Sequence, residues 1–154
     1  MTAVLDVPRV GNQTPQYLIA PSPDAGYTSF DAEDAVEYAA FYKLVADTWQ
    51  ATTCEAWMRR DISTGKWLAG TWAITVSRQN GKNGALEIFE LYAMTQLGLR
   101  VLHTAHEVKT ARKAFIRLKS FFGEKRDDPN ARFPDLNALV LEVRNTNGQD
   151  AIVL

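Results

Sequence analysis

The sequence predicts an α/β fold in which a mostly parallel sheet carries helices on its faces. Three features indicate this. A β-branched and aromatic run over residues 67–76 ends in a polar loop, an apolar helical segment follows the loop, and a second apolar run comes after that segment. The resulting β-α-β-α-β order is typical of parallel sheets, because parallel neighbours need a crossover connection that is usually a helix.

Composition narrows the class of protein. A chain of 154 residues with 46% hydrophobic content is long enough to bury one core. With 17 basic and 18 acidic side chains, the formal net charge is −1, which gives no indication of a nucleic acid or a membrane as a partner. The single cysteine, Cys54, excludes an internal disulfide and fits a reduced, intracellular setting. Residues 1–10 lack the features of a signal peptide, and no apolar run is long enough to span a membrane, so we expect a soluble protein.

The first third of the chain is expected to be an arm followed by two helices. Residues 1 to about 30 are rich in Pro and Gly, which favours an extended arm over a surface. Asp31 is a candidate N-cap for an amphipathic helix that reaches about Asp47. A second short helix is expected over residues 52–60, and a turn over residues 61–66 precedes the strand at 67–76.

The middle of the chain alternates helix and strand. A helix over residues 85–97 should stop at Gly98, and residues 99–104 form the next expected strand. Residues 104–107, Thr-Ala-His-Glu, have the form of a capping box that would open another helix. The core face of that helix should hold Val108, Ala111, Phe115, Leu118 and Phe122.

The end of the chain should form a hairpin. Residues 138–144 and 151–154 are apolar runs on either side of Asn147-Gly148, a strong hairpin signal. Because Ala151–Leu154 is an apolar strand with no turn or polar tail after it, we expect the sheet to be incomplete at this end. The chain would then be a fragment, or one piece of a larger polypeptide.

The loop between residues 77 and 83 has the composition of a phosphate-binding loop. Backbone N–H groups at a helix N-terminus point at an anion, Gly81 allows close approach, and Lys82 supplies a mobile ammonium. The usual pattern, G-x-x-x-x-G-K-[ST], would place Gly at Val76 and a hydroxyl at Asn83, although an amide oxygen can still bind Mg²⁺. The alternative is an ordinary Asn-Gly turn with a solvated lysine.

Three stretches of the chain together resemble one known family. They are Asp47-Thr-Trp-Gln50, then Val76-Ser-Arg-Gln-Asn-Gly-Lys-Asn83 followed by residues 87–92, and Leu102-His-Thr-Ala-His-Glu-Val-Lys-Thr-Ala-Arg112. This combination is similar to the large terminase subunit of tailed bacteriophages, in particular of phages that infect actinobacteria. The resemblance spans the chain from about Tyr27 to Leu154.

The resemblance implies a DNA-packaging motor with an N-terminal P-loop ATPase domain and a C-terminal nuclease domain. Residues 31–154 would be the N-terminal part of the ATPase domain, in the host cell cytoplasm. The implied cofactors are ATP and Mg²⁺. The implied partners are double-stranded viral DNA, the portal protein, the small terminase subunit and other large subunits in a ring, with no membrane.

The resemblance also assigns roles to residues of this chain. Lys82 would hold the β- and γ-phosphates and Arg78 would sense or stabilise the γ-phosphate, which makes them the two catalytic candidates. Gln50 would contact the adenine edge, and residues 103–106 would lie near the nucleotide. The expected nucleotide-binding set is Trp49, Gln50, Ser77, Gln79, Asn80, Gly81, Lys82 and Asn83, with Asn83 also the Mg²⁺ ligand.

Parts of a complete motor have no match in the sequence. The family's Walker B element is an apolar strand that ends in Asp-Glu, and the nearest run, residues 139–142, fits the hairpin better. The acidic cluster of a metal-dependent nuclease is also missing. We therefore expect weak nucleotide binding at most and almost no hydrolysis. The alternative function is a non-catalytic terminase fragment or assembly module with a vestigial phosphate loop. A third option is another helicase-like or nucleotide-kinase P-loop protein.

Other reactive or charged side chains have plainer interpretations. His103 and His106 lack a carboxylate or Cys that would complete a metal site, and Cys54 is expected to pack under a helix. The basic residues between 109 and 119 fit a solvated helix surface better than a DNA track. The four tryptophans are expected in the core or in the walls of an adenine pocket.

Overall fold

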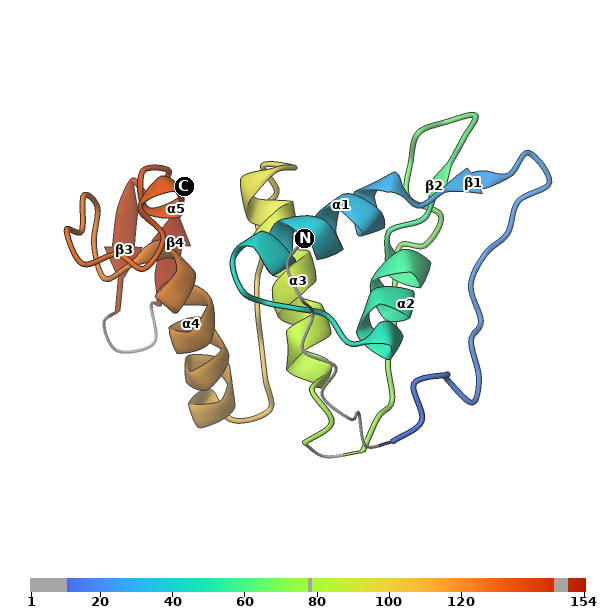
Figure 1. Ribbon diagram of the computed structural model, residues 1–154, viewed down its shortest axis with the longest axis horizontal. Helices are drawn as coiled ribbons and strands as arrows, with labels where there is room; N and C mark the ends of the chain where they lie inside the picture. The colour runs from blue at the N-terminus through green and yellow to red at the C-terminus, as the bar shows by residue number, and fades with distance from the viewer. Residues whose placement is uncertain (1–10, 78, 146–149) are drawn as a thin grey trace, which may run out of the picture.

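A computed structural model describes residues 11–77, 79–145 and 150–154, and in these ranges the chain mixes helices with short strands (Figure 1). The helices are α1 (Phe30–Phe41), α2 (Thr48–Trp57), α3 (Lys82–Thr95), α4 (Val108–Phe122) and α5 (Pro134–Asn137). The strands are β1 (Tyr27–Thr28), β2 (Arg60–Asp61), β3 (Glu142–Arg144) and β4 (Ala151–Val153). None of the helices in the described ranges is long and apolar enough to cross a membrane.

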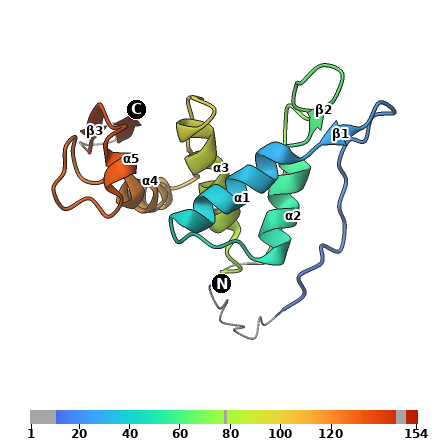
Figure 2. The same ribbon diagram turned by 45° about the horizontal axis from the view of Figure 1, so that its top comes forward.

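Helices α1, α2 and α3 enclose the first part of the core. The buried face of α1 consists of Ala32, Ala35 and Ala39, whose spacing places them on one side of the helix. These small side chains let α1 cross close over α3, where Ile88 is fully buried, and Figure 2 shows that crossing. Full burial of a side chain such as Ile88 contributes about 1.5–3 kcal/mol.

Helices α4 and α5 and the β3–β4 hairpin form a second group beside the first (Figures 1 and 2). Its buried residues Leu118, Phe122, Leu136 and Val140 meet Leu91 of α3. Two half-buried residues near the end of α1, Tyr38 and Leu44, pack against both clusters. The two groups therefore share one continuous apolar interior.

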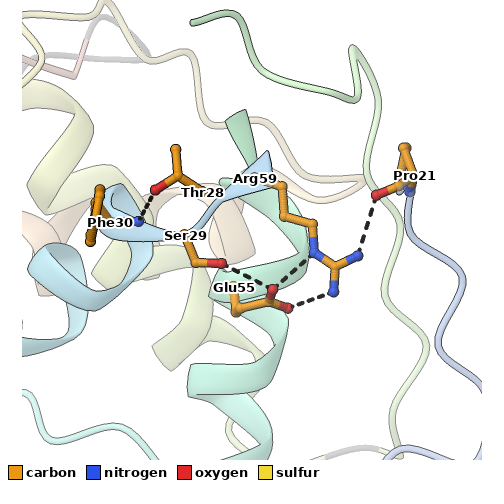
Figure 3. Close-up of polar contacts among 6 residues, drawn as sticks. All are labelled: Pro21, Thr28, Ser29, Phe30, Glu55 and Arg59. Carbon is orange, nitrogen blue, oxygen red and sulfur yellow. Dashed lines mark hydrogen bonds and ion pairs between the residues drawn. The ribbon is translucent and has the colours of Figure 1, made fainter. Parts of the chain in front are cut away.

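The N-terminal arm is tied to α2 by a polar network drawn in Figure 3. Residues 11–26 contain no helix or strand. The Glu55 carboxylate accepts from Nε and Nη2 of Arg59 at 2.9 Å each and from the Ser29 hydroxyl at 3.1 Å. Nη1 of Arg59 donates to the Pro21 carbonyl at 3.3 Å, and its guanidinium lies 4.2 Å from the centre of the Tyr27 ring.

The turn expected over residues 61–66 is confirmed. β1 and β2 pair antiparallel, with Tyr27 opposite Asp61. Oδ1 of Asp61 then accepts from the backbone N–H groups of Ser63 and Thr64 at 2.8 Å each, as aspartate commonly does in turns. Hydrogen bonds from Ser63 and Thr64 to the Asp61 carboxylate lower its pKa.

The expected parallel sheet is not formed by the described residues. The two sheets are two-stranded and antiparallel, β1–β2 and β3–β4. The strands expected over residues 67–76 and 99–104 are wrong, since these segments form no ladder and only Trp67 makes an isolated bridge, to Arg60. Both segments lack a neighbouring strand, and β-propensity cannot replace the inter-strand hydrogen bonds that define a strand.

Residues 71–77 nevertheless keep the two-residue alternation of a strand. Trp72, Ile74 and Val76 are half-buried, and the residues between them are exposed. Trp72 and Ile74 pack against the cluster around α1–α3. In Figure 1 residues 71–77 and 99–107 both run opposite to α3, one on the α2 side and one on the α4 side. Residues 71–77, α3 and residues 99–107 therefore follow one another in the expected directions, but the two segments do not pair into a sheet.

Two helix boundaries differ from the expectation near residue 45. α1 ends at Phe41 and not near Asp47, because the N–H groups of Lys43 and Leu44 return to the carbonyls of Ala40 and Ala39 at 3.0 and 2.9 Å. This is a Schellman motif, which closes a helix. The second expected helix exists but begins at Thr48, not at residue 52.

The beginning of α4 also differs from the expectation. Thr104 does not cap the helix, because α4 begins at Val108 with Glu107 at the N-cap position. Val108, expected in the core, is 80% exposed, whereas Leu118 and Phe122 are buried as expected. Ala111 and Phe115 of the expected core face are half-buried, so burial increases from the start of α4 toward its end.

The C-terminal hairpin is confirmed. β3 and β4 pair antiparallel with Val143 opposite Ile152, and the Asn147-Gly148 turn lies outside the described residues. Glu142 lies in β3, in agreement with the hairpin interpretation of residues 139–142. Its carboxylate accepts a hydrogen bond from Nε of Arg144 at 2.7 Å. The short helix α5 was not expected; its first residue is Pro134, and proline suits the first turn because that N–H has no partner in the helix.

Candidate functional site

The candidate site is the loop that leads into α3. Its last residue, Gly81, is the N-cap and has the left-handed conformation, with φ of 73°. Gly84 donates its N–H to the Gly81 carbonyl at 2.8 Å, which closes the first turn. The first N–H groups of a helix have no partner inside the helix, and the helix dipole makes this end positive. The exposed Lys82 side chain adds a charge beside them, so this end of α3 can attract an anion.

Gln50 of α2 holds this loop in place. Its Nε2 donates to the Gly81 carbonyl at 2.7 Å, and its Oε1 accepts from the Asp47 N–H at 2.7 Å. Together with the Asp47 side chain, which faces the Gln50 backbone N–H, the second bond forms a capping box at the start of α2. Gln50 is only 7% exposed, so the helix start and the loop are joined through one buried carboxamide.

Gly84 is required by this close approach. A Cβ at residue 84 would lie 2.6 Å from Nε2 of Gln50, closer than non-bonded atoms can come. A Cβ on Gly81 would lie 3.1 Å from the same nitrogen and 3.9 Å from Cζ2 of Trp49. The indole of Trp49 is thus beside the loop, and the two glycines allow α2 and α3 to meet at their N-terminal ends.

The structure brings most of the expected nucleotide-binding residues together. Trp49 and Gln50 reach the loop from α2, although they are some thirty residues away in the sequence. Ser77, Gln79, Asn80, Gly81 and Lys82 are exposed and Asn83 is half-buried, whereas Arg78 lies outside the described residues. Gln79 also has a positive φ, 63°, so the loop turns sharply before the helix. The nucleotide contacts themselves stay predictions.

The capping role of Gln50 could have been found in the sequence. Asp47-Thr-Trp-Gln50 has the spacing of a capping box, with an acceptor at the N-cap and a glutamine three residues later. Both polar groups of the Gln50 carboxamide are engaged inside the protein. One N–H of Nε2 remains for a base, which is less than an adenine edge can use.

Each of the two histidines lies beside a glutamate. Nδ1 of His103 lies 2.6 Å from Glu90, and the exposed His106 lies 3.9 Å from Glu107. No group of three or more His, Cys, Asp or Glu residues within the described ranges is arranged to hold a metal ion. Cys54 is fully buried with Sγ 3.9 Å from the Ala85 carbonyl of α3, and burial raises its pKa to about 12. The expectation that this thiol packs under a helix is confirmed.

Two buried glutamates on α3 were not anticipated from the sequence. Glu87 and Glu90 are 3% and 5% exposed. Arg117 of α4 donates from Nη2 to Glu87 at 2.9 Å, and its Nε lies 2.8 Å from the other carboxylate oxygen. Desolvation raises the pKa of Glu87, and the charge of Arg117 opposes that rise. The only sequence signal is a pair of acidic residues, three apart, within an apolar helical run.

The basic residues of α4 divide into two groups. Lys109, Arg112 and Lys113 are exposed, as a solvated helix surface predicts. Arg117 is paired with Glu87, and Lys119 is buried and paired with Glu124. Two of the basic residues of α4, Arg117 and Lys119, therefore form ion pairs within the protein.

Comparisons with known proteins assign no function to the α3 loop, so its geometry is the evidence for its role. That geometry comprises a left-handed glycine, an exposed lysine at a helix start and a buried glutamine that joins them to α2. No protein-family model, curated protein or solved structure matches the chain.

Proposed function

We propose that this chain is the N-terminal, nucleotide-binding part of the ATPase of a phage terminase large subunit, the motor that packages viral DNA. The observation that carries the proposal is the loop at the start of α3. There Gly81 is left-handed, Lys82 is exposed at the first helical position, and Gln50 fixes the backbone from behind. A phosphate chain of ATP needs this combination of a fixed backbone and a mobile cation.

Electrostatics favour a phosphate at this position. Charge at a helix N-terminus is stabilised by about 0.3–1 kcal/mol, and by up to about 2 kcal/mol when it is partly buried. Lys82 has no ion-pair partner among the described residues, so its ammonium is available to a ligand. A lysine at the end of a flexible side chain can follow the outer phosphates as a point charge.

The remaining roles follow from the resemblance and the placement of the loop. Arg78 would contact the γ-phosphate, and Trp49 and Gln50 would flank the base. Asn83 would offer one neutral amide oxygen to Mg²⁺, which would be held mainly by the phosphates themselves. Hydrolysis also needs a carboxylate that positions water, so this chain would act as one half of a site in the assembled motor.

A second function, a non-catalytic assembly module of a terminase, is favoured by one observation. Gln50 uses its carboxamide to cap α2 and to hold the loop, which gives the loop a structural role that needs no nucleotide. Such a module would keep the loop fold while Lys82 served no ligand.

The two functions differ in DNA-dependent ATP turnover by the complete packaging assembly. In a motor, Lys82→Ala should abolish turnover, and the matched control Lys66→Ala, an exposed lysine in the 61–66 turn, should leave it unchanged. Equal turnover in both variants would favour the module. Circular dichroism of the two variants checks that the fold is intact.

A further inference from the structure

A polar cavity lies away from the α3 loop, between the end of α1, the middle of α3, the middle of α4 and the segment before α5. It is partly open to solvent and has a volume of about 240 Å³. Three cationic side chains line it, Lys43 just after α1, Arg117 from α4 and Arg132 from the segment before α5. Ser120 adds a hydroxyl and Phe121 an aromatic wall. Three separate parts of the chain thus bring positive charge to one small space.

The charges in this cavity are not balanced by the protein. Glu87 is the one carboxylate in the lining, and it is bound by Arg117. Lys43 and Arg132 have no ion-pair partner among the described residues. Counting all four groups, the lining carries a surplus of about two positive charges.

Arg132 is positioned by aromatic rings rather than by an anion. Its guanidinium lies 4.8 Å from the centre of the Phe133 ring. That ring is stacked on Phe121 at 5.9 Å and meets Tyr42 edge-on at 5.0 Å. A guanidinium that rests on a ring face keeps its N–H donors at its edge, where they are available to a ligand.

Lys43 occupies a position where glycine would be less strained. It is the left-handed residue of the Schellman motif that ends α1, with φ of 67°. Glycine is the usual residue there, because a Cβ is disfavoured in the left-handed region. Backbone strain of this kind gathers at functional positions, and here it coincides with a side chain that lines the cavity without a counter-ion.

We propose that this cavity binds a phosphate group through Lys43, Arg117 and Arg132. Arginine presents N–H donors that match the oxygens of a phosphate, and lysine adds a point charge. Nε and Nη2 of Arg117 contact Glu87, so its Nη1 group is the donor that remains for a ligand. The phosphate belongs either to a small phosphorylated molecule or to a nucleic-acid backbone. The inference does not depend on the function proposed for the α3 loop.

The test is a calorimetric titration of the full chain, first with inorganic phosphate and then with a short duplex DNA. The cavity variants are Lys43→Gly and Arg132→Gln, and the control is Lys66→Ala. Lys82→Ala reports any phosphate that binds at the α3 loop instead. Lys43→Gly suits the test because it relieves backbone strain. We expect it to raise the unfolding temperature while it weakens binding by about tenfold or more.

The outcomes separate the sources of phosphate and the two sites. If both cavity variants weaken the binding of inorganic phosphate and Lys66→Ala does not, the result supports a site for a small phosphorylated ligand. The same pattern with duplex DNA alone supports a backbone phosphate. Absence of binding by both probes, or equal affinity in all variants, overturns the proposal. Loss in Lys82→Ala alone also overturns it, since the phosphate would then occupy the α3 loop.

Discussion

Replacement of Gln50 by alanine should destabilise the whole α1–α3 unit, because this buried side chain joins two helix starts. The change removes the bond to the Gly81 carbonyl and the bond from the Asp47 N–H, both 2.7 Å long. It also removes the buried acceptor of the Asp47 N–H, since Gln50 is 7% exposed, whereas the Gly81 carbonyl keeps its bond from the Gly84 N–H.

The magnitude follows from these two bonds. Each contributes about 1 kcal/mol net, and a buried group left unpaired costs about 1–3 kcal/mol. Water can enter the space that the side chain leaves and replace part of the lost hydrogen bonding. We therefore expect the free energy of unfolding to fall by about 2–3 kcal/mol. For a chain of this length that lowers the unfolding temperature by about 5–10 °C.

The assay is urea unfolding followed by circular dichroism, with the free energy of unfolding extrapolated to water. Gln96→Ala is the matched control, because Gln96 is exposed just beyond the end of α3. Gln50→Glu separates the two bonds, since it keeps the acceptor for Asp47 and loses the donor to Gly81. If Gln50→Ala stays within about 0.5 kcal/mol of wild type, the buried tie is not significant and the reasoning fails.

Three further changes test other parts of the structure. Lys43→Gly should stabilise the chain by about 0.5–1 kcal/mol in differential scanning calorimetry, because relief of left-handed strain exceeds the added flexibility of glycine in the unfolded chain; a lowered unfolding temperature would contradict this. Gly84→Ala should destabilise the chain by about 1–3 kcal/mol because its Cβ would meet Gln50, whereas Gly70→Ala, with open space around it, should have little effect. The pKa of Glu87 is raised on folding, so the folded state holds its proton longer and stability falls as pH rises from the ordinary glutamate pKa to the raised one. Glu87→Gln should remove that part of the pH dependence in urea unfolding at stepped pH, and identical profiles would show that Glu87 is not responsible.

The longer helices and the hairpin could be predicted, apart from their exact ends, because their signals are local. The α3 segment is bounded by the loop and by Gly98, and the hairpin is marked by Asn147-Gly148. The sheet could not be predicted in the same way. Residues 71–77 alternate like a strand, but a strand needs a partner, and sequence pattern does not reveal whether one is present.

The candidate site could be predicted in part. Gly81 and Lys82 before a helix indicate the loop directly. The resemblance assigned Gln50 to the adenine edge, and neither its hydrogen bond to the loop nor its capping geometry was predicted. Lys43 gives no local signal of its left-handed conformation, since lysine is common in every type of structure. The cavity it shares with Arg117 and Arg132 depends on packing among elements far apart in the chain.

The most direct test of the central claim is calorimetric binding of a non-hydrolysable ATP analogue with Mg²⁺ to this chain. We expect weak binding by the wild type and by Lys66→Ala, and its loss in Lys82→Ala. Binding that is unchanged in Lys82→Ala, or that is absent from all three proteins, would contradict a nucleotide-binding loop at the start of α3.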